Sequence, residues 1–291
     1  MVTIACSAEE VASGRLTEAH FQEALEAMDR DGMVVLKDVI APEHIEVLRE
    51  KLLEDVAQFT GRKDAPFNFN RGNIQQDPPP FPPYLFRDVL VNELVISITK
   101  AILGPGVKSN FYSGNTAIKS DQRQPPHADV GQLFTTLVVP TFGIVVNVPV
   151  VDMSPKNGST EIWLGTHKNP AVWIHAPKID VPQEAMDRYR AEGMTPLQPT
   201  VSAGSVLLRD IRMWHAGMPN HTDSPRPMIA MIHWSSWFDV GEPLKFPKGT
   251  EELFQHPDLR TRAIFVEEPI DYINAPHAYD FHEEESEPAN V

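Results

Sequence analysis

Cysteine is almost absent from this chain, and its scarcity excludes several chemistries. Cys6 is the single cysteine among 291 residues, so one chain holds neither an internal disulfide nor a cysteine-ligated zinc cluster. A metal bound by this chain therefore needs histidine or carboxylate ligands. The sequence has 11 histidines and 40 acidic residues from which to supply them.

Positive charge and long hydrophobic runs are also scarce. Lys and Arg total 25, which leaves a formal net charge of −15, and such a charge repels nucleic-acid phosphates and anionic lipid. The longest apolar runs, such as FGIVVNVPVV, are too short to span a bilayer, and the start of the chain lacks the basic-then-apolar order of a signal peptide. We expect a cytoplasmic protein that binds a small molecule, without nucleic-acid or membrane partners.

Helical spacing of apolar residues marks the first third of the chain. One helix is expected at about 17–30, before Gly32, a second at 41–59 with Pro42 at its start, and a third at 93–104. The run MVVLKDVI between the first two predicts a strand.

A proline-rich segment, 64–88, contains six prolines and five aromatic residues. It has too much proline for regular structure and too many aromatic residues for a solvated linker. Two interpretations stay open for Phe67, Phe69, Phe81 and Tyr84. These aromatic residues either cover the hydrophobic core or form a lid over a substrate.

Short β-like runs separated by turn signals follow from residue 107. They predict a sandwich or barrel, and their bounds are 107–120, 133–141, 142–152, 160–167, 205–215 and 227–238. From about residue 251 the pattern is lost, and the acidic end HEEESEPANV is typical of a frayed terminus.

Four histidines have an acidic residue two positions later, so this spacing alone indicates little. On a strand, residues i and i+2 share a face, which lets His127 and Asp129 converge on one ion. His44 lies in a predicted helix, His256 has a proline inside its pair, and His282 belongs to the acidic tail.

A third ligand is expected from His215, at the end of the predicted strand SVLLRDIRMW. Two histidines and one carboxylate make the facial triad typical of non-haem Fe(II), with open positions for a co-substrate and oxygen. Arg226 follows eleven residues later, within reach of a hairpin. Its planar guanidinium suits the terminal carboxylate of a dicarboxylic keto acid.

These residues, with NGSTEIWLGTH between them, resemble the phytanoyl-CoA dioxygenase family of Fe(II)/2-oxoglutarate-dependent oxygenases over about residues 25–240. The stretch QPPHAD resembles the fungal natural-product members. The resemblance implies a mainly β fold, a double-stranded β-helix or jelly roll with flanking helices. We therefore expect one domain over 1–291, with N-terminal helices at about 17–103, a jelly-roll core at about 107–240 and a C-terminal extension at about 250–291.

The resemblance also implies roles for individual residues. His127, Asp129 and His215 would be the catalytic metal ligands for Fe(II), with 2-oxoglutarate and O2 as co-substrates. Arg226 would bind the distal carboxylate of 2-oxoglutarate. Gln124 and Thr160 would form hydrogen bonds with the same co-substrate.

The activity implied is oxidation of an unactivated C–H bond, by hydroxylation, desaturation or rearrangement, in a small, largely apolar secondary metabolite. Two features depart from the family or its variants. Gly217 stands where the family often has a serine or glycine, so a serine hydroxyl contact to the co-substrate is absent, and Asp129 is retained where halogenases have a small residue.

Three other functions stay open. An acyl-CoA hydroxylase of the same family would need basic contacts for the nucleotide phosphates, and the chain has no evident basic run. A catalytically silent jelly-roll binding protein would leave the triad unexplained. A zinc hydrolase could use the same ligands, but it has no use for Arg226. The favoured assembly is a homodimer.

Overall fold

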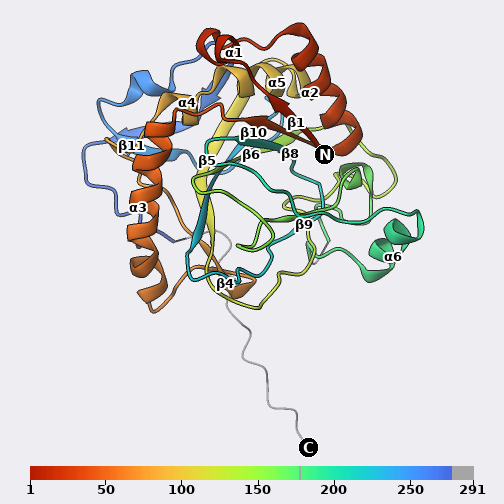
Figure 1. The fold of residues 1–291 in the computed structure, drawn as a ribbon. Helices are drawn as coiled ribbons and strands as arrows, with labels where there is room; N and C mark the ends of the chain where they lie inside the picture. Colours follow the sequence, from red (N-terminus) through yellow and green to blue (C-terminus); the bar gives the residue numbers. More distant parts are fainter. Residues whose placement is uncertain (177, 277–291) are drawn as a thin grey trace, which may run out of the picture.

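A large mixed sheet is the framework of the molecule (Figure 1). The structure, a computed structural model, describes residues 1–176 and 178–276, so the acidic end of the chain lies outside the described residues. The strands of this sheet lie in the order β1 (Val2–Ala5), β2 (Met33–Lys37), β8 (Val206–Asp210), β6 (Gly143–Pro149), β10 (Arg226–Trp234), β5 (Val107–Ala117), β4 (Asn70–Gln75) and β3 (Phe67–Asn68), and β12 (Leu259–Thr261) also pairs with β5.

A second, smaller layer faces this sheet. β7 (Glu161–Ile162) pairs antiparallel with β9 (His215–Ala216), and single bridges join His127 to His215 and Ile162 to Leu197. A further parallel pair, β11 (Leu244–Pro247) with β13 (Ala263–Val266), lies apart. The predicted mainly β jelly roll with flanking helices is confirmed.

The predicted helices are also present. α2 (Glu18–Asp31) begins after Thr17, whose hydroxyl accepts from the His20 amide, and it ends at Gly32. The other two are α3 (Pro42–Gly61) and α5 (Glu93–Leu103), and three shorter helices were not predicted: α1 (Ala8–Ser13), α4 (Arg87–Leu90) and α6 (Gln183–Ala191). In Figure 1, α2 and α5 lie near β1 whereas α3 runs beside β5. Among the described residues no helix is both long and apolar enough to cross a bilayer.

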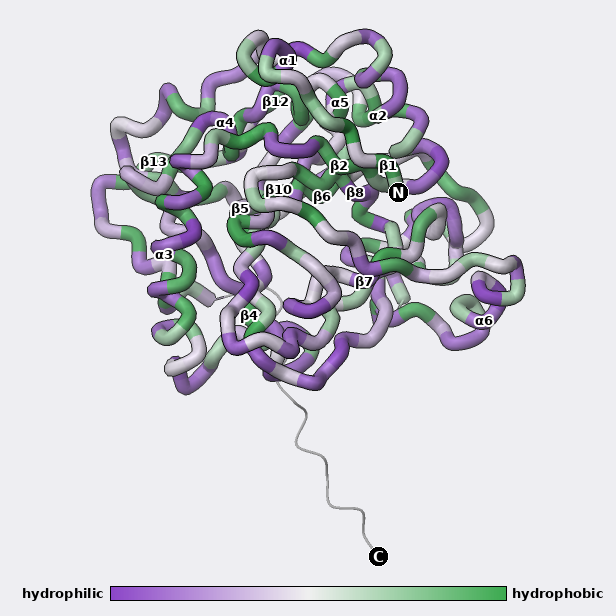
Figure 2. Tube along the Cα trace, viewed as in Figure 1, coloured by the Kyte–Doolittle hydropathy of each residue, from purple (hydrophilic) through white to green (hydrophobic). Residues whose placement is uncertain are grey.

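Alternation along the central strands separates a core from a cavity. On β6, Val146 and Val148 pack in the main hydrophobic cluster beneath the helices, whereas Val145 and Asn147 face a cavity. β8 and β10 alternate in the same way. Figure 2 shows the hydrophobic residues concentrated on these strands. The inner face of the sheet is therefore available for a ligand.

Several local predictions were wrong. The proline-rich segment 64–88 does contain regular structure, β3 and β4, and in the run 160–167 the strand is limited to Glu161–Ile162. The run 133–141 is a loop, whose Val139 packs beside Phe142 rather than pairing in a sheet. The run 205–215 is not one strand, because a turn after Asp210 separates β8 from β9. The chain after 251 does not lose its structure, since β12 joins the main sheet.

Replacing Gly32 by alanine should destabilise the fold. Its φ of 76° is left-handed, and an added Cβ would lie 2.5 Å from His167 Nδ1. The conformational cost alone is about 1–2 kcal/mol. Urea unfolding should show at least this loss, whereas Gly61→Ala, in open space at the end of α3, should leave stability unchanged or slightly raised. Equal stability of both variants would contradict the expectation.

Candidate active site

His127, Asp129 and His215 come together at one end of the cavity. One ligand atom from each lies within 4.8 Å of the other two, the separation expected around a single ion. The two histidines are joined through their backbones, because each N–H donates to the other's carbonyl at 2.9 Å. The expected i, i+2 strand geometry is only partly present, since His127 forms isolated bridges to His215 and Asp180 outside any strand and Asp129 lies in a bend.

Both histidine rings are oriented by a backbone carbonyl. The Nδ1–H of His127 donates to Pro125 O at 2.9 Å, and that of His215 donates to Met213 O at 3.1 Å. This leaves each Nε2 lone pair for a metal. Burial, together with the nearby His215 ring, lowers the pKa of His127 to about 3. His127 is therefore neutral at pH 7, the form that binds a metal.

Arg209, on β8, holds the carboxylate of Asp129. Its Nη2 donates to Asp129 Oδ2 at 2.6 Å, while Oδ1 faces His215 Nε2 at 3.5 Å. Burial alone would raise the pKa of Asp129, but Arg209 and His215 outweigh it and hold that pKa well below the ordinary value. The Asp129 carboxylate is charged, with one oxygen free. The role of Arg209 was not predicted from the sequence, although a single cation within the apolar strand VLLRD could have indicated it.

Arg226 is a buried cation with incomplete pairing. Its Nη2 donates to Gly158 O at 2.8 Å, but its Nε and Nη1 have no partner in the described part of the chain. Burial lowers the pKa of Arg226 to about 10, so the group stays cationic at pH 7. Such unpaired donors are costly unless a ligand satisfies them, which fits the distal carboxylate of a bound keto acid.

Gln124 and Thr160 both line the cavity. The Gln124 amide bridges two backbone segments, since Oε1 accepts from Gly217 N at 2.7 Å and Nε2 donates to Asn68 O at 3.0 Å. One N–H of that amide is left for a ligand. The Thr160 hydroxyl has no hydrogen-bond partner within residues 1–176 and 178–276.

A cavity of about 590 Å³ opens beside the three metal-ligand residues. Its wall on the main sheet carries carboxamides that were not predicted, Gln75, Asn115 and Asn147, whereas its outer part is mostly apolar. The outer wall comprises Val130, Ile174, Ile179, Ile232, Trp234 and Phe238.

Phe69 covers the metal-ligand residues. Its ring lies 4.4 Å from the His127 ring, and its φ of 64° is rare for a bulky residue. Strain of this kind is typical of functional sites. Phe67 and Phe81 instead pack in a cluster with Phe59. The aromatic segment thus divides between the two interpretations, with Phe69 at the site and these two residues in the core.

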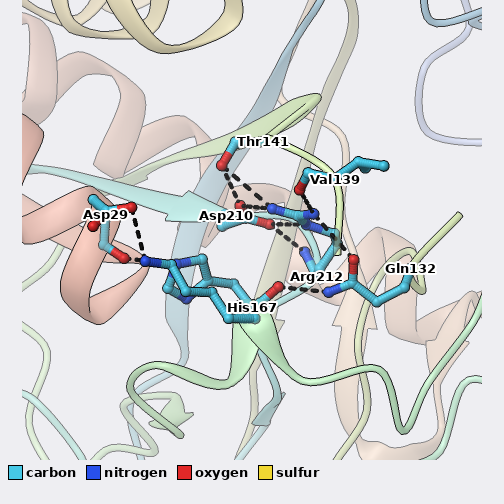
Figure 3. A network of polar contacts seen from close by, with 8 residues as sticks. Asp29, Gln132, Val139, Thr141, His167, Asp210 and Arg212 are labelled. Atoms are coloured by element: carbon cyan, nitrogen blue, oxygen red, sulfur yellow. Dashed lines mark hydrogen bonds and ion pairs between the residues drawn. The ribbon is translucent and has the colours of Figure 1, made fainter. Parts of the chain in front are cut away.

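A buried polar network braces the chain on both sides of the site (Figure 3). Arg212 pairs with Asp210 at 2.7 Å and donates to Gln132 Oε1 and Val139 O. Gln132 in turn donates to the carbonyl of His167. Since Gln132 follows Asp129 and Arg212 precedes His215, the network ties the two metal-ligand segments to one another.

Comparison with known proteins identifies the family. The model of the family described as phytanoyl-CoA dioxygenase (PhyH) matches residues 28–228. The chain belongs to this family, and it is an iron(II)- and 2-oxoglutarate-dependent dioxygenase. Among curated proteins, Dioxygenase af480 of Aspergillus fumigatus is 23% identical over 221 residues, which cover 75% of this chain and 67% of that protein.

Solved structures show the same fold at low identity. AviO1 from Streptomyces viridochromogenes is 22% identical with a TM-score of 0.57, covering 78% of this chain and 100% of that one. EctD from S. alaskensis is 17% identical with a TM-score of 0.57, covering 78% and 80%. HygX from Streptomyces hygroscopicus, solved with nickel, 2-oxoglutarate and hygromycin B, is 18% identical with a TM-score of 0.53, covering 84% and 97%.

Arg212→Leu should destabilise the protein strongly. The substitution leaves the fully buried carboxylate of Asp210 without its cation, a change that costs about 3–5 kcal/mol. Chemical unfolding measures the loss. The matched control is Arg30→Leu, which removes an exposed pair with Asp31 and should change stability little. Equal effects of the two substitutions would show that the network does not brace the fold.

Proposed function

We propose that this protein oxidises an unactivated C–H bond of a small, largely apolar molecule, in secondary metabolism. Iron(II) would be held by His127, Asp129 and His215, and 2-oxoglutarate by Arg226. One observation carries the proposal: three convergent ligand side chains and a buried, incompletely paired guanidinium belong to the same jelly-roll interior. The similarity to a fungal dioxygenase agrees with it.

Bound iron and 2-oxoglutarate supply the oxidising chemistry, in which O2 provides one oxygen atom to succinate and the other to oxidation of the substrate. The chain's own residues orient the reactants. The two histidines present Nε2, and Arg209 pairs with Asp129 Oδ2, which leaves Oδ1 directed toward the histidines. Phe69 covers one side of the centre and excludes water.

Gln124 and Thr160 complete the co-substrate site in this proposal. The second amide N–H of Gln124 and the hydroxyl of Thr160 would donate to 2-oxoglutarate, and both residues line the cavity that contains the metal ligands. A zinc hydrolase or a silent binding protein would leave the buried cation of Arg226 unmatched.

The cavity favours an apolar substrate over an acyl-CoA. Apart from the metal ligands, the charged groups in its described lining are Arg209, which is already paired, and the carboxylates Asp239 and Glu242. The three phosphate groups of a CoA would find no free cation in this described lining, and the net charge of −15 repels them at long range. The apolar outer wall instead suits a compact hydrocarbon frame.

We also propose that residues 1–291 form one oxygenase domain, because β12 from the predicted extension pairs with β5 of the core. The cytoplasmic location and the homodimer stay predictions from the sequence.

Anaerobic addition of Fe(II) and 2-oxoglutarate to the metal-free protein tests the central proposal. We expect the visible charge-transfer absorption of an iron-bound keto acid. His127→Ala and His215→Ala should abolish both the absorption and succinate release, because two remaining ligands hold iron weakly. Arg226→Ala should keep the absorption but raise the 2-oxoglutarate Kd, by roughly ten-fold or more for a lost charged hydrogen bond.

The control for these variants is His221→Ala, an exposed histidine beside Asp121 and outside the cavity lining, which should behave like the parent. A folded, iron-loaded parent protein without the absorption would reject the assignment of the site.

Acyl-CoA substrates should not stimulate turnover. Phytanoyl-CoA and palmitoyl-CoA should release no succinate above the substrate-free background at low ionic strength, where repulsion from this acidic protein is strongest. The measurement is 2-oxoglutarate-dependent succinate release with and without each thioester. Stimulation by either compound, with formation of a hydroxyacyl product, would make the acyl-CoA hydroxylase the correct alternative.

A further inference from the structure

Unsatisfied buried polar atoms gather next to Arg226. Ten buried side-chain nitrogen or oxygen atoms in the described part of the chain have no hydrogen-bond partner. Four of them belong to two residues, Nε and Nη1 of Arg226 and both amide atoms of Asn73. Because native proteins pair nearly all such groups, four unpaired atoms on these two residues suggest a ligand that the fold itself does not supply.

Strand register places Asn73 and Arg226 on one face. Asn73 on β4 is opposite Ala117 on β5, and Ala117 is opposite Arg226 on β10. Directly opposed residues point to the same side of a sheet, here the inner side, on which Met228 and Ala230 line the cavity. The methyl group of Ala117 fills little of the space between the amide and the guanidinium.

Gly217 connects the space around Asn73 with the proposed metal ligand His215. Gly217 lies two residues after His215, and a Cβ added to it would lie 3.1 Å from Asn73 Nδ2 and 2.5 Å from Gln124 Oε1. The absence of a side chain at this position lets both amides approach the strand that carries the metal ligand. Asn73 therefore lies close to Gly217 and Gln124, on the same face of the sheet as Arg226.

The hydrogen-bonding groups of Arg226 and Asn73 favour a carboxylate as the ligand. Arg226 offers N–H donors, and the Asn73 amide offers an NH2 donor together with an oxygen that can accept from Arg226. A carboxylate accepts hydrogen bonds only, and it can receive several at once. The amide N–H of Asn73 would thus donate to the same carboxylate as the guanidinium.

We infer that Asn73 is a second binding residue for the distal carboxylate of 2-oxoglutarate, acting together with Arg226. The inference rests on the proposed function. Nothing in the segment NFNRGNIQQ marks Asn73 in the sequence except that polar side chains, Asn73 and Gln75, occupy the inward positions of a strand.

The test compares two keto acids in the Fe(II)-loaded protein without oxygen. 2-Oxoglutarate and pyruvate share the chelating end, but pyruvate lacks the distal carboxylate. Asn73→Leu, of similar size, should raise the Kd of 2-oxoglutarate about ten-fold or more, as measured by titration of the charge-transfer absorption. The Kd of pyruvate and the Kd of Fe(II) should stay within about two-fold of the parent values.

Two further variants make the result decisive. Thr116→Val removes a buried hydroxyl from the outer side of the same strand pair and should change neither keto-acid Kd. If Asn73→Leu does not fold, Asn73→Asp replaces it, and repulsion between carboxylates should weaken 2-oxoglutarate more than pyruvate.

An unchanged 2-oxoglutarate Kd, or equal weakening of both keto acids, would overturn the role of Asn73. Absence of the absorption in the parent protein would reject the proposed function itself, and the inference with it.

Discussion

The backbone pairing of His127 with His215 is the contact on which the site depends. Two reciprocal N–H to carbonyl bonds of 2.9 Å join residues that are 88 positions apart in the chain, and no side chain takes part in them. This pairing fixes the separation of the two imidazole rings in the folded, metal-free protein. The loss of conformational entropy needed to bring the two histidines together therefore occurs on folding and not on metal binding. Arg209 then fixes Asp129, and the Arg212–Asp210 pair ties the flanking segments.

Buried charge is used in two distinct ways in this interior. Arg209 and Arg212 each face a carboxylate, and these pairs hold backbone segments in place because breaking a buried pair leaves an uncompensated charge. Arg226 is different, since a backbone carbonyl is its single partner in the described chain. Arginine therefore stabilises the scaffold at two positions, whereas at the third its unpaired N–H groups support the proposal that it binds an anion.

Local patterns predicted the three longer helices and most of the central strands. Thr17 and Gly32 bound α2 as expected, because capping and left-handed termination depend on the residues themselves. The run 133–141 was predicted wrongly as a strand, since Leu133 and Val139 pack in the cluster of Phe142 without joining a sheet, and its phenylalanine and other leucine are exposed. A strand needs a partner as well as a propensity, and the partner is not visible in the run.

The sequence alone was enough to propose which residues form the iron site, because the His-x-Asp pair, the later histidine and the arginine eleven positions on are a chemical set that spacing and resemblance reveal. Only the tertiary structure decided how that set is supported. Arg209, Asn73 and the carboxamides of the cavity wall come from four strands distant in sequence. Their roles arise from cross-strand register and burial, which no local pattern records. The physical reason is that ligand identity is a property of side chains, whereas pairing, desolvation and unmatched hydrogen bonds exist only once distant strands are packed together.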